Sequence, residues 1–540
     1  MSDSQTEHYE TDYKVGQDNI QRFGMDIHNP VFMVSACAMS IMVAIVLIFN
    51  QEASDMFGSL KPWLTKQFDW VFMIGVNIFV LFCLLLIVSP MGKIRIGGKD
   101  AKPEFSYLGW FAMLFAAGMG IGLVFYGVLE PMNHTLKPPL GQPGLVDEAG
   151  NIIAANIDQA KSIGMAGTFV HWNIHPWAIY SVVALALAIF CYNKKLPLSI
   201  RSAFYPLLGE RTWGWPGHLI DITAVFATLA GLATSLGIGA GQASAGLNYL
   251  FDTGDGLDTK IIVVLVITAI ALISVLRGLN AGVKLLSEVN MIMALLLMLF
   301  VFAIGPTMEI LSGIGSNIVT YVEKLPALSN WVGREDSYFL HDWSTTYWAW
   351  WIAWSPFVGM FIARISKGRT VREFIVCVIL IPSLVSSIWM TVFGTTAIEQ
   401  FISDGYTGVV DTITNWAPEL ALFKMLDELP FTTVTSVLGI ILVVVFFITS
   451  LDSGALVIDM ITSGGKTDAP TRQRVFWCCF EATIAITLLV GGGLVALQAF
   501  SIAMGFPFCL VLMLMCVSLW KGLSSELTLL KGPPHPSPQQ

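Results

Sequence analysis

Charge is scarce in this sequence of 540 residues. Asp, Glu, Lys and Arg make up 12% of the chain, hydrophobic residues make up 55%, and the mean hydropathy is +0.69. Soluble globular proteins carry about twice this share of charged residues. The composition therefore excludes a soluble protein and predicts an all-α polytopic membrane protein. The net charge of -9 also argues against a nucleic-acid partner.

Three other features are missing. The eight cysteines show no CxxC spacing and lie in or beside apolar runs, so we interpret them as small core residues. No cleavable signal peptide is recognisable, because the first 29 residues are polar and the first apolar run is too long for one. No Lys or Arg lies in the interior of an apolar run.

Long apolar runs dominate what remains. A membrane-spanning helix needs about 20 apolar residues. We predict twelve transmembrane helices, at residues 30–50, 69–90, 107–130, 168–192, 218–250, 259–276, 284–305, 343–364, 373–398, 431–459, 475–492 and 498–520.

Lys and Arg are distributed unevenly between the loops. With the N-terminus inside, seventeen of them fall in inside loops and eight in outside loops. Positive loops stay cytoplasmic, so both termini are predicted to be cytoplasmic. The longer outside segment 306–342 predicts an amphipathic interfacial helix. Its apolar residues at helical spacing are Ile310, Ile314, Ile318, Val322 and Leu325.

The stretch AGMGIGLVFY, residues 117–126, places three glycines in the middle of a membrane-length run: Gly118, Gly120 and Gly122. Each glycine weakens a helix by about 1 kcal/mol relative to alanine. The spacing of Gly118 and Gly122 matches the GxxxG motif of packed helices, but that motif does not need Gly120. We therefore predict an unwound segment, which is unfavourable against lipid and useful around a ligand.

Hydroxyl groups gather in the run FFITSLDS, at Thr449, Ser450 and Ser453. Buried hydroxyls often bond back to the carbonyl four residues earlier. They also suit Na+, a hard cation that prefers oxygen ligands, and a broken helix crossing nearby would supply further carbonyls. Both interpretations stay open at this point.

Aromatic residues crowd the run YWAWWIAWSPFVGMF. Trp350, Trp351 and Trp354 fall within an arc of about 100 degrees on a helix. Pro356 removes the hydrogen bond to the carbonyl of Ile352, which predicts a second interruption by a kink.

The run HWNIHPWAIY adds Trp172, Trp177 and Tyr180 on one broad face. A single tryptophan is most often a core residue, but six aromatics beside two interrupted helices favour another use. A box of aromatic faces attracts a quaternary ammonium group by about 1 to 2 kcal/mol per ring when desolvated. Free N–H groups of the glycine segment would hold an anionic end.

Other chemistries have little support. His171 and His175 are four residues apart, but Pro176 breaks the geometry and no second pair exists, so a metal or haem enzyme is not expected. No nucleophile–base pair is recognisable, and a passive channel would need a continuous polar lining. We expect no enzyme and no cofactor. The acidic residues within the runs are Glu130, Asp221, Glu288, Asp452, Asp459 and Glu481.

The two interrupted runs are the third and the eighth. Corresponding breaks in two halves indicate an inverted-repeat transporter. We predict five-helix repeats at 107–305 and 343–520, two additional helices in 30–106, and cytoplasmic tails at 1–29 and 521–540.

Four strings together resemble the betaine/carnitine/choline transporter family: GMGIGLVFYG, HWNIHPWAIY, YWAWWIAWSPFVGMFIARISKGRTVREF and FFITSLDS. The resemblance is greatest to the sodium-coupled glycine betaine symporters and covers the chain apart from its tails. It implies a LeuT-like inverted repeat of 5+5 helices preceded by two helices. It also implies a homotrimer in lipid, in the bacterial inner membrane.

The resemblance further implies site residues. The aromatic box would use Trp172, Trp177, Tyr180 and Trp351, with Trp350 and Trp354 as additional contacts. The broken segment would contact substrate through Gly118, Met119, Gly120 and Gly122. The Na+ site would use the carbonyls of Ala116, Met119 and Phe446 and the hydroxyls of Thr449 and Ser450.

The same resemblance points to substrate and coupling. The sodium-independent carnitine exchangers lose the hydroxyl cluster and the full glycine pattern, so sodium symport is favoured. Gly122, where choline-type members tend to carry Asp, favours a zwitterion such as glycine betaine. The pair aligned with a second sodium site reads Thr228 and Leu232, which leaves the stoichiometry open. The short C-terminal tail argues against strong osmotic gating.

The expected function is Na+-coupled import of glycine betaine, or of a related onium zwitterion, by alternating access. The alternatives are a sodium-independent exchanger of trimethylammonium compounds, and uptake of dimethylsulfoniopropionate, choline, carnitine or ectoine.

Overall fold

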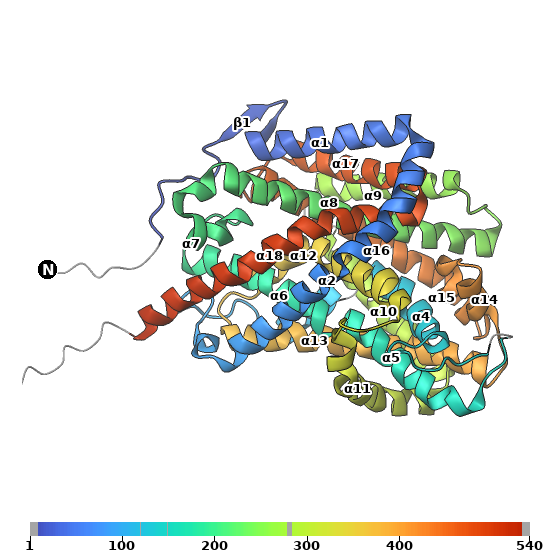
Figure 1. Cartoon of the computed structure of the whole chain (residues 1–540). Helices are drawn as coiled ribbons and strands as arrows, with labels where there is room; N and C mark the ends of the chain where they lie inside the picture. Colours follow the sequence, from blue (N-terminus) through green and yellow to red (C-terminus); the bar gives the residue numbers. More distant parts are fainter. Residues whose placement is uncertain (1–8, 119, 148–149, 278–282, 532–540) are drawn as a thin grey trace, which may run out of the picture.

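The computed structural model describes residues 9–118, 120–147, 150–277 and 283–531. Over these residues the chain is predominantly helical, with one two-stranded sheet, as expected for the all-α class (Figure 1). The sheet is an antiparallel hairpin of β1 (Asn19–Arg22) and β2 (Met25–His28). Phe23 and Gly24 form its turn with φ of 55° and 73°.

Most of the long helices overlap a predicted span, although the third and fourth runs are each divided into two helices and α11 (Thr307–Ser329) was not predicted as a span. In chain order they are α1 (Asn29–Ile48), α2 (Asn50–Val88), α3 (Tyr107–Gly118), α4 (Ile121–Leu136), α5 (Ile157–Trp172), α6 (Ile174–Ala188), α8 (Trp215–Phe251), α9 (Leu257–Arg277), α10 (Val283–Ile304), α11 (Thr307–Ser329), α12 (Thr345–Ile365), α13 (Val371–Ile402), α16 (Thr432–Thr462), α17 (Thr471–Val490) and α18 (Gly493–Lys531).

Shorter elements connect them. The short α-helices are α7 (Tyr205–Leu208), α14 (Gly408–Thr414) and α15 (Ala421–Asp427). The 3₁₀ turns are η1 (Pro90–Lys93), η2 (Ala154–Asn156), η4 (Arg201–Phe204), η5 (Gly209–Trp213) and η7 (Pro418–Leu420). Two π-helical turns, η3 (Ile189–Asn193) and η6 (Tyr338–Ser344), lie next to α6 and α12.

In the described part of the chain, ten helices are long and apolar enough to cross a membrane. The bent pair of α3 and α4 makes an eleventh if it is one span. The 21-residue α12 is not among them, because its tryptophans and polar residues have lower hydropathy than the aliphatic residues of the other spans. The predicted count of twelve helices, and their arrangement as an inverted repeat, therefore stay predictions.

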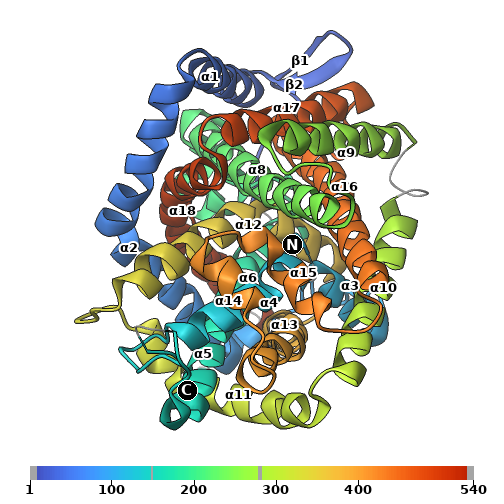
Figure 2. The same ribbon diagram turned by 90° about the vertical axis from the view of Figure 1, so that its right-hand side faces the viewer.

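The centre of the bundle is formed by α4, α6 and α12. Every residue of α4 from Ile121 to Thr135 is buried, and so is every residue of α6 from His175 to Ala188. Helix α12 packs against α6, α8 and α18, while α4 packs against α5, α8 and α13. Figure 2 shows these central helices enclosed by the others, and Figure 1 shows α1 beside α17 at the periphery. The side chains of α4 from Ile121 to Thr135 and of α6 from His175 to Ala188 are therefore enclosed by protein, whereas α12 exposes Phe361 and Arg364 near its end.

Polar contacts join the connecting segments and helix ends into two separate groups, one on each face of the helix bundle. On one face, the Arg201 guanidinium donates to the Tyr13 hydroxyl at 2.8 Å, which joins the N-terminal segment to the loop after α6. That loop also carries Lys194, whose Nζ lies 2.7 Å from Oε1 of Glu526 near the end of α18. These segments were all predicted to lie inside.

The opposite face joins the segments predicted to lie outside. Lys61 donates to the side chain of Gln498 at 2.9 Å, which links α2 to the start of α18. Lys260 and Glu419 form an ion pair at 3.6 Å between the start of α9 and η7. Each of these contacts joins segments of the same predicted side, which is consistent with the loop assignment.

The predicted amphipathic segment after α10 is helical, as α11. It packs against α5 and α13. Its buried residues are Ile310, Gly313, Asn317, Tyr321 and Leu328. Val322, which was predicted to lie on the apolar stripe, is exposed instead. The other four residues of the predicted stripe, Ile310, Ile314, Ile318 and Leu325, are buried or packed against the core, so only Val322 departs from it. Small and polar residues share the packed side, where Asn317 donates to the hydroxyl of Thr391 at 3.3 Å.

Candidate functional site

The predicted interruption of the third run is present. Helices α3 and α4 are bent by 65° relative to each other. Gly120 precedes α4 in an extended conformation, with φ -164° and ψ -178°. A Cβ at Gly120 would meet no atom within 4 Å, so the backbone there borders open space. Met119, a predicted substrate and Na+ contact, lies outside the described residues, and only the backbone of Gly118 is described, at the end of α3.

A second break, which the sequence analysis missed, separates α5 from α6. Asn173 lies between them with φ -105° and ψ -115°, three residues before Pro176. The break leaves the carbonyl of His171 to accept a hydrogen bond from the indole of Trp351 at 2.9 Å. His175 lies beyond the break, with its Nε2 3.3 Å from Oδ1 of Asn77. A proline three residues after an Asn was the available signal in the sequence.

The eighth run is not broken at Pro356, and the kink predicted there stays a prediction. Helix α12 continues through Pro356 without ending. Proline removes the hydrogen bond to the carbonyl of Ile352, but the hydroxyl of Ser355 donates to that carbonyl at 2.7 Å. A neighbouring hydroxyl therefore satisfies the acceptor that the proline leaves open.

Five of the predicted aromatic residues form a continuous set of ring contacts. The rings of Trp172 and Trp351 meet edge to face with centroids 5.0 Å apart. Tyr180 lies 6.2 Å from Trp351, and Trp177 lies 5.3 Å from Tyr180. Trp350 stacks on Trp351 at 4.8 Å. We call Trp172, Trp177, Tyr180, Trp350 and Trp351 the aromatic group.

Trp354 lies apart from the ring contacts of this group. Its indole donates to the carbonyl of Gly231 at 2.8 Å and to the hydroxyl of Ser235 at 2.9 Å. Trp350 donates to the same hydroxyl at 3.1 Å. These two indoles attach α12 to α8, and the ring of Trp354 contacts Phe357 at 5.2 Å.

Two tyrosines that were not predicted also belong beside the aromatic group. Tyr126 lies 6.1 Å from both Trp172 and Trp350, between ring centroids. Tyr347 lies 5.5 Å from Trp172 and 5.9 Å from Trp351. Helical spacing could have identified Tyr347, because it stands one turn before Trp351 on the same helix.

Gly122 brings the backbone of α4 against the aromatic group. A Cβ there would lie 2.8 Å from the indole of Trp172 and 2.9 Å from that of Trp350. Both distances are shorter than a carbon–carbon contact allows. Glycine is therefore required at this position for the two indoles to keep their places.

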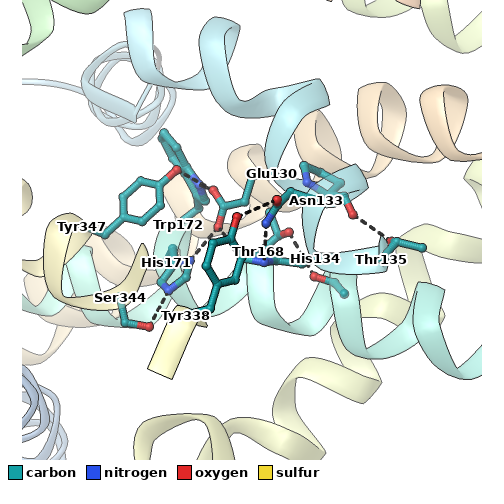
Figure 3. Close-up of polar contacts among 12 residues, drawn as sticks. Glu130, Asn133, His134, Thr135, Thr168, His171, Trp172, Tyr338, Ser344 and Tyr347 are labelled. Carbon is teal, nitrogen blue, oxygen red and sulfur yellow. Dashed lines mark hydrogen bonds and ion pairs between the residues drawn. The ribbon is translucent and has the colours of Figure 1, made fainter. Parts of the chain in front are cut away.

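The carboxylate of Glu130 lies beside Trp172, a member of the aromatic group, and beside Tyr347 (Figure 3). It accepts hydrogen bonds from Tyr347 at 2.5 Å, from His171 Nδ1 at 2.6 Å and from Trp172 Nε1 at 2.7 Å. His134 Nε2 lies 3.3 Å from the same carboxylate without hydrogen-bond geometry. In the sequence, Glu130 is only one of several acidic residues in apolar runs.

Glu130, His134 and His171 are the one group in the described part of the chain with three potential metal-ligating atoms within 4.8 Å of one another. The carboxylate oxygens already accept from Trp172 and Tyr347, and Nδ1 of His171 is turned to the carboxylate as a donor. The arrangement is therefore that of a hydrogen-bonded network.

Of the residues predicted for Na+, Ala116 lies on α3, Phe446, Thr449 and Ser450 lie on α16, and Met119 is outside the described residues. Thr449 donates to the carbonyls of Val445 and Phe446, both at 3.1 Å, which is the bonding within the helix that the sequence left open. Thr449 and Ser450 are both partly exposed. Ala116 stands two residues before the end of α3. Whether these oxygens bind Na+ together stays a prediction.

A separate cavity of about 250 Å³ opens on the face of the Lys260–Glu419 pair. Its wall comes from α4, α8, α9, α17 and α18 and from η7. The lining residues are Phe125, Gly237, Ile238, Gly241, Leu257, Lys260, Glu419, Leu489, Gly493, Leu494 and Leu497. Phe125 precedes Tyr126, so the cavity approaches the aromatic group from one side without including it.

Sequence comparison places these features among known proteins. The family model of the BCCT, betaine/carnitine/choline family transporters matches residues 30–528. A glycine betaine/proline/choline transporter of Vibrio parahaemolyticus is 55% identical over 527 residues, covering 96% of this chain and 94% of that protein. Glycine betaine transporter 1 of the same organism is 50% identical, covering 96% and 97%. The glycine betaine transporter OpuD of Bacillus subtilis is 40% identical over 484 residues, covering 89% and 91%.

The matches extend over nearly all of the described helices and over the whole aromatic group. A family model that covers most of the chain, together with relatives of 40% identity or more, is decisive for membership. The chain therefore belongs to the betaine/carnitine/choline family, as a multi-pass membrane transporter and not an enzyme.

Proposed function

We propose that this transporter imports glycine betaine, or a related zwitterion with an onium group and a carboxylate, by Na+-coupled alternating access. The observation that carries the proposal is the aromatic group, which adjoins the break between α5 and α6 and lies against Gly122, two residues after the break before α4. An onium head offers no N–H donor, so it is recognised best by ring faces, which attract cations through their quadrupole. The relatives named for glycine betaine support the same substrate class.

The carboxylate end of the substrate suits the start of α4. The first N–H groups of a helix have no partner within it and carry the positive end of its dipole. Gly120 borders open space, and Gly122 touches Trp172 and Trp350. A substrate a few ångströms long would thus reach from these N–H groups to the aromatic group.

Sodium would bind beside this segment, at Thr449 and Ser450 with carbonyls of Ala116, Met119 and Phe446. The partial exposure of both hydroxyls leaves them accessible to an ion. A cation there would join α16 to the end of α3 and organise the broken segment for the carboxylate. The differential affinity of the two conformations for both ligands would then couple their transport.

The exposure of side chains on α12 supports a conformation in which the proposed substrate site opens toward the cytoplasmic side. Trp351, Trp354 and Phe357 are partly exposed at intervals of three residues along α12, whereas α4 is buried. The face with the N-terminal segment and Glu526 carries most of the Lys and Arg, so we assign it to the cytoplasm of a bacterial inner membrane.

A homotrimer is proposed with α11 at the interface. Its outward side exposes Met308, Leu311, Val319 and Val322, which would be covered by a neighbouring copy or by lipid. Cross-linking of cysteine variants on this side, followed by mass measurement in nanodiscs, tests the assembly. Bands no larger than the monomer at every position would contradict it.

Uptake of labelled glycine betaine into proteoliposomes tests the main proposal. We expect accumulation with an inward NaCl gradient and none with KCl. A sodium-independent exchanger would instead show counterflow in both salts. Competition by proline, choline, ectoine, carnitine and dimethylsulfoniopropionate defines the substrate, and choline as the strongest competitor would overturn the preference for a zwitterion.

A further inference from the structure

One buried carboxylate binds side chains from two other helices. Glu130 on α4 accepts from His171 and Trp172 at the end of α5, and from Tyr347 on α12, at 2.6, 2.7 and 2.5 Å. All four residues are buried. Figure 3 shows the three donors directed at the same carboxylate. Trp172 is a member of the aromatic group, and Tyr347 contacts it.

These hydrogen bonds fix ring orientation. An isolated carboxylate in an apolar interior is strongly disfavoured, so its donors must be held close to it. Hydrogen bonds to an ionised acceptor are also about twice as strong as those between neutral groups. An indole and a phenol each have a single donor, which lies in the ring plane. The position of Glu130 therefore determines how the rings of Trp172 and Tyr347 are turned.

His171 connects Glu130 to a third aromatic ring, that of Trp351. Because the carboxylate can only accept, Nδ1 of His171 carries the proton, and its Nε2 accepts from the hydroxyl of Ser344 at 2.9 Å. The carbonyl of His171 holds the indole of Trp351 at 2.9 Å. The pair of Glu130 and His171 thus connects to Trp172, Tyr347 and Trp351.

We propose that Glu130 is a positioning residue for the cation-binding rings. It sets the planes of Trp172 and Tyr347, and its negative charge adds to the attraction that their ring faces exert on an onium group. The inference rests on the proposed function, because it assigns Glu130 a role in binding the onium end of the substrate.

Glu130→Gln tests the proposal. The amide has nearly the same shape, but its NH₂ group is a donor that faces donors, so at least one ring loses its partner. We expect glycine betaine to bind about tenfold more weakly, as expected for the loss of one hydrogen bond to a charged group, with the half-saturating Na+ concentration unchanged. Tyr347→Phe, which keeps the ring, should weaken binding in the same direction. The double variant should lose less than the product of the two single effects, because both remove the same interaction.

Glu481→Gln is the matched control. Glu481 is equally buried, on α17, and its oxygens have no hydrogen-bond partner in the described structure. We expect this variant to bind glycine betaine as the wild type does. Wild-type affinity in Glu130→Gln would overturn the proposal, and wild-type affinity in Tyr347→Phe would do so if Glu130→Gln does not fold.

A measurement without substrate separates this inference from the proposed function. The difference in fluorescence between the wild type and Trp172→Phe reports the emission of Trp172. Glu130→Gln should shift that difference spectrum in the substrate-free protein. A wild type that binds no betaine, with the spectral shift present, would refute the proposed function alone. An unchanged difference spectrum would refute the positioning role.

Discussion

The indole N–H of Trp351 donates a 2.9 Å hydrogen bond to the backbone carbonyl of His171. The acceptor is available because α5 and α6 part at Asn173, two residues later. A break in one helix therefore anchors an aromatic ring of another. This relationship connects the irregular backbone, which is tolerated in a membrane only inside protein, to the position of a ring that would bind the substrate.

Replacing Trp351 with leucine should weaken glycine betaine binding by about tenfold or more, because one desolvated ring contributes about 1 to 2 kcal/mol to cation binding. Binding by isothermal titration calorimetry checks this. Trp63→Leu is the control, since Trp63 is exposed on α2 and should leave the affinity unchanged. Equal affinities in both variants would exclude Trp351 from the site.

Gly122→Ala and Gly120→Ala should differ in stability. The Cβ at Gly122 would lie 2.8 Å from the indole of Trp172, whereas the Cβ at Gly120 meets nothing within 4 Å. Overpacking of this kind costs about 1 to 3 kcal/mol. Gly122→Ala should therefore melt at a lower temperature, and Gly120→Ala should melt near the wild type because its extended backbone tolerates a side chain. A reversed order would contradict the close approach of α4 to the two indoles.

Removing both hydroxyls, in Thr449→Ala with Ser450→Ala, should raise the half-saturating Na+ concentration for uptake by about tenfold, the effect of losing about 1.4 kcal/mol of binding free energy. Thr487→Ala removes a hydroxyl that bonds to the carbonyl of Thr483 within α17, and serves as the control. Uptake measured over a range of Na+ concentrations gives the value for each variant. An unchanged Na+ dependence in the double variant would place the coupling site elsewhere.

Acid should lower the folding stability of the protein through His28, the last residue of the β1–β2 hairpin. Burial, with the nearby guanidinium of Arg201, lowers the pKa of His28 to about 3. The unfolded chain takes up this proton near pH 6.5, so between pH 6.5 and 3 the unfolded state binds more protons and stability falls as the pH falls. From pH 7.5 to 5 the loss is about 2 kcal/mol.

Thermal melting of the wild type and of His28→Asn at both pH values measures this loss. The variant should lose less stability than the wild type on acidification. The same pH dependence in both proteins would show that other groups are responsible.

The sequence could predict features that depend on neighbouring residues. Span positions follow from local hydropathy, and the break near Gly120 follows from three glycines within five residues. Several features escaped prediction because their partners are distant in the chain. Val322 is exposed, for example, because α11 packs through residues such as Asn317, which contacts Thr391 on α13.

The candidate site shows the same division. Trp172 and Trp351 could be identified from the sequence strings that contain them. Their edge-to-face contact could not be predicted, because the two residues are 179 positions apart and lie on different helices. Glu130 looked like several other acidic residues until the structure brought Trp172 and Tyr347 to it.

The sequence by itself determined that this protein lies in a membrane, where its long apolar runs are, and which family it belongs to, because hydropathy and motif spacing are properties of consecutive residues. Only the tertiary structure decided which rings face one another and which acid orients them. Those contacts depend on helix packing, which brings together residues that no local pattern connects.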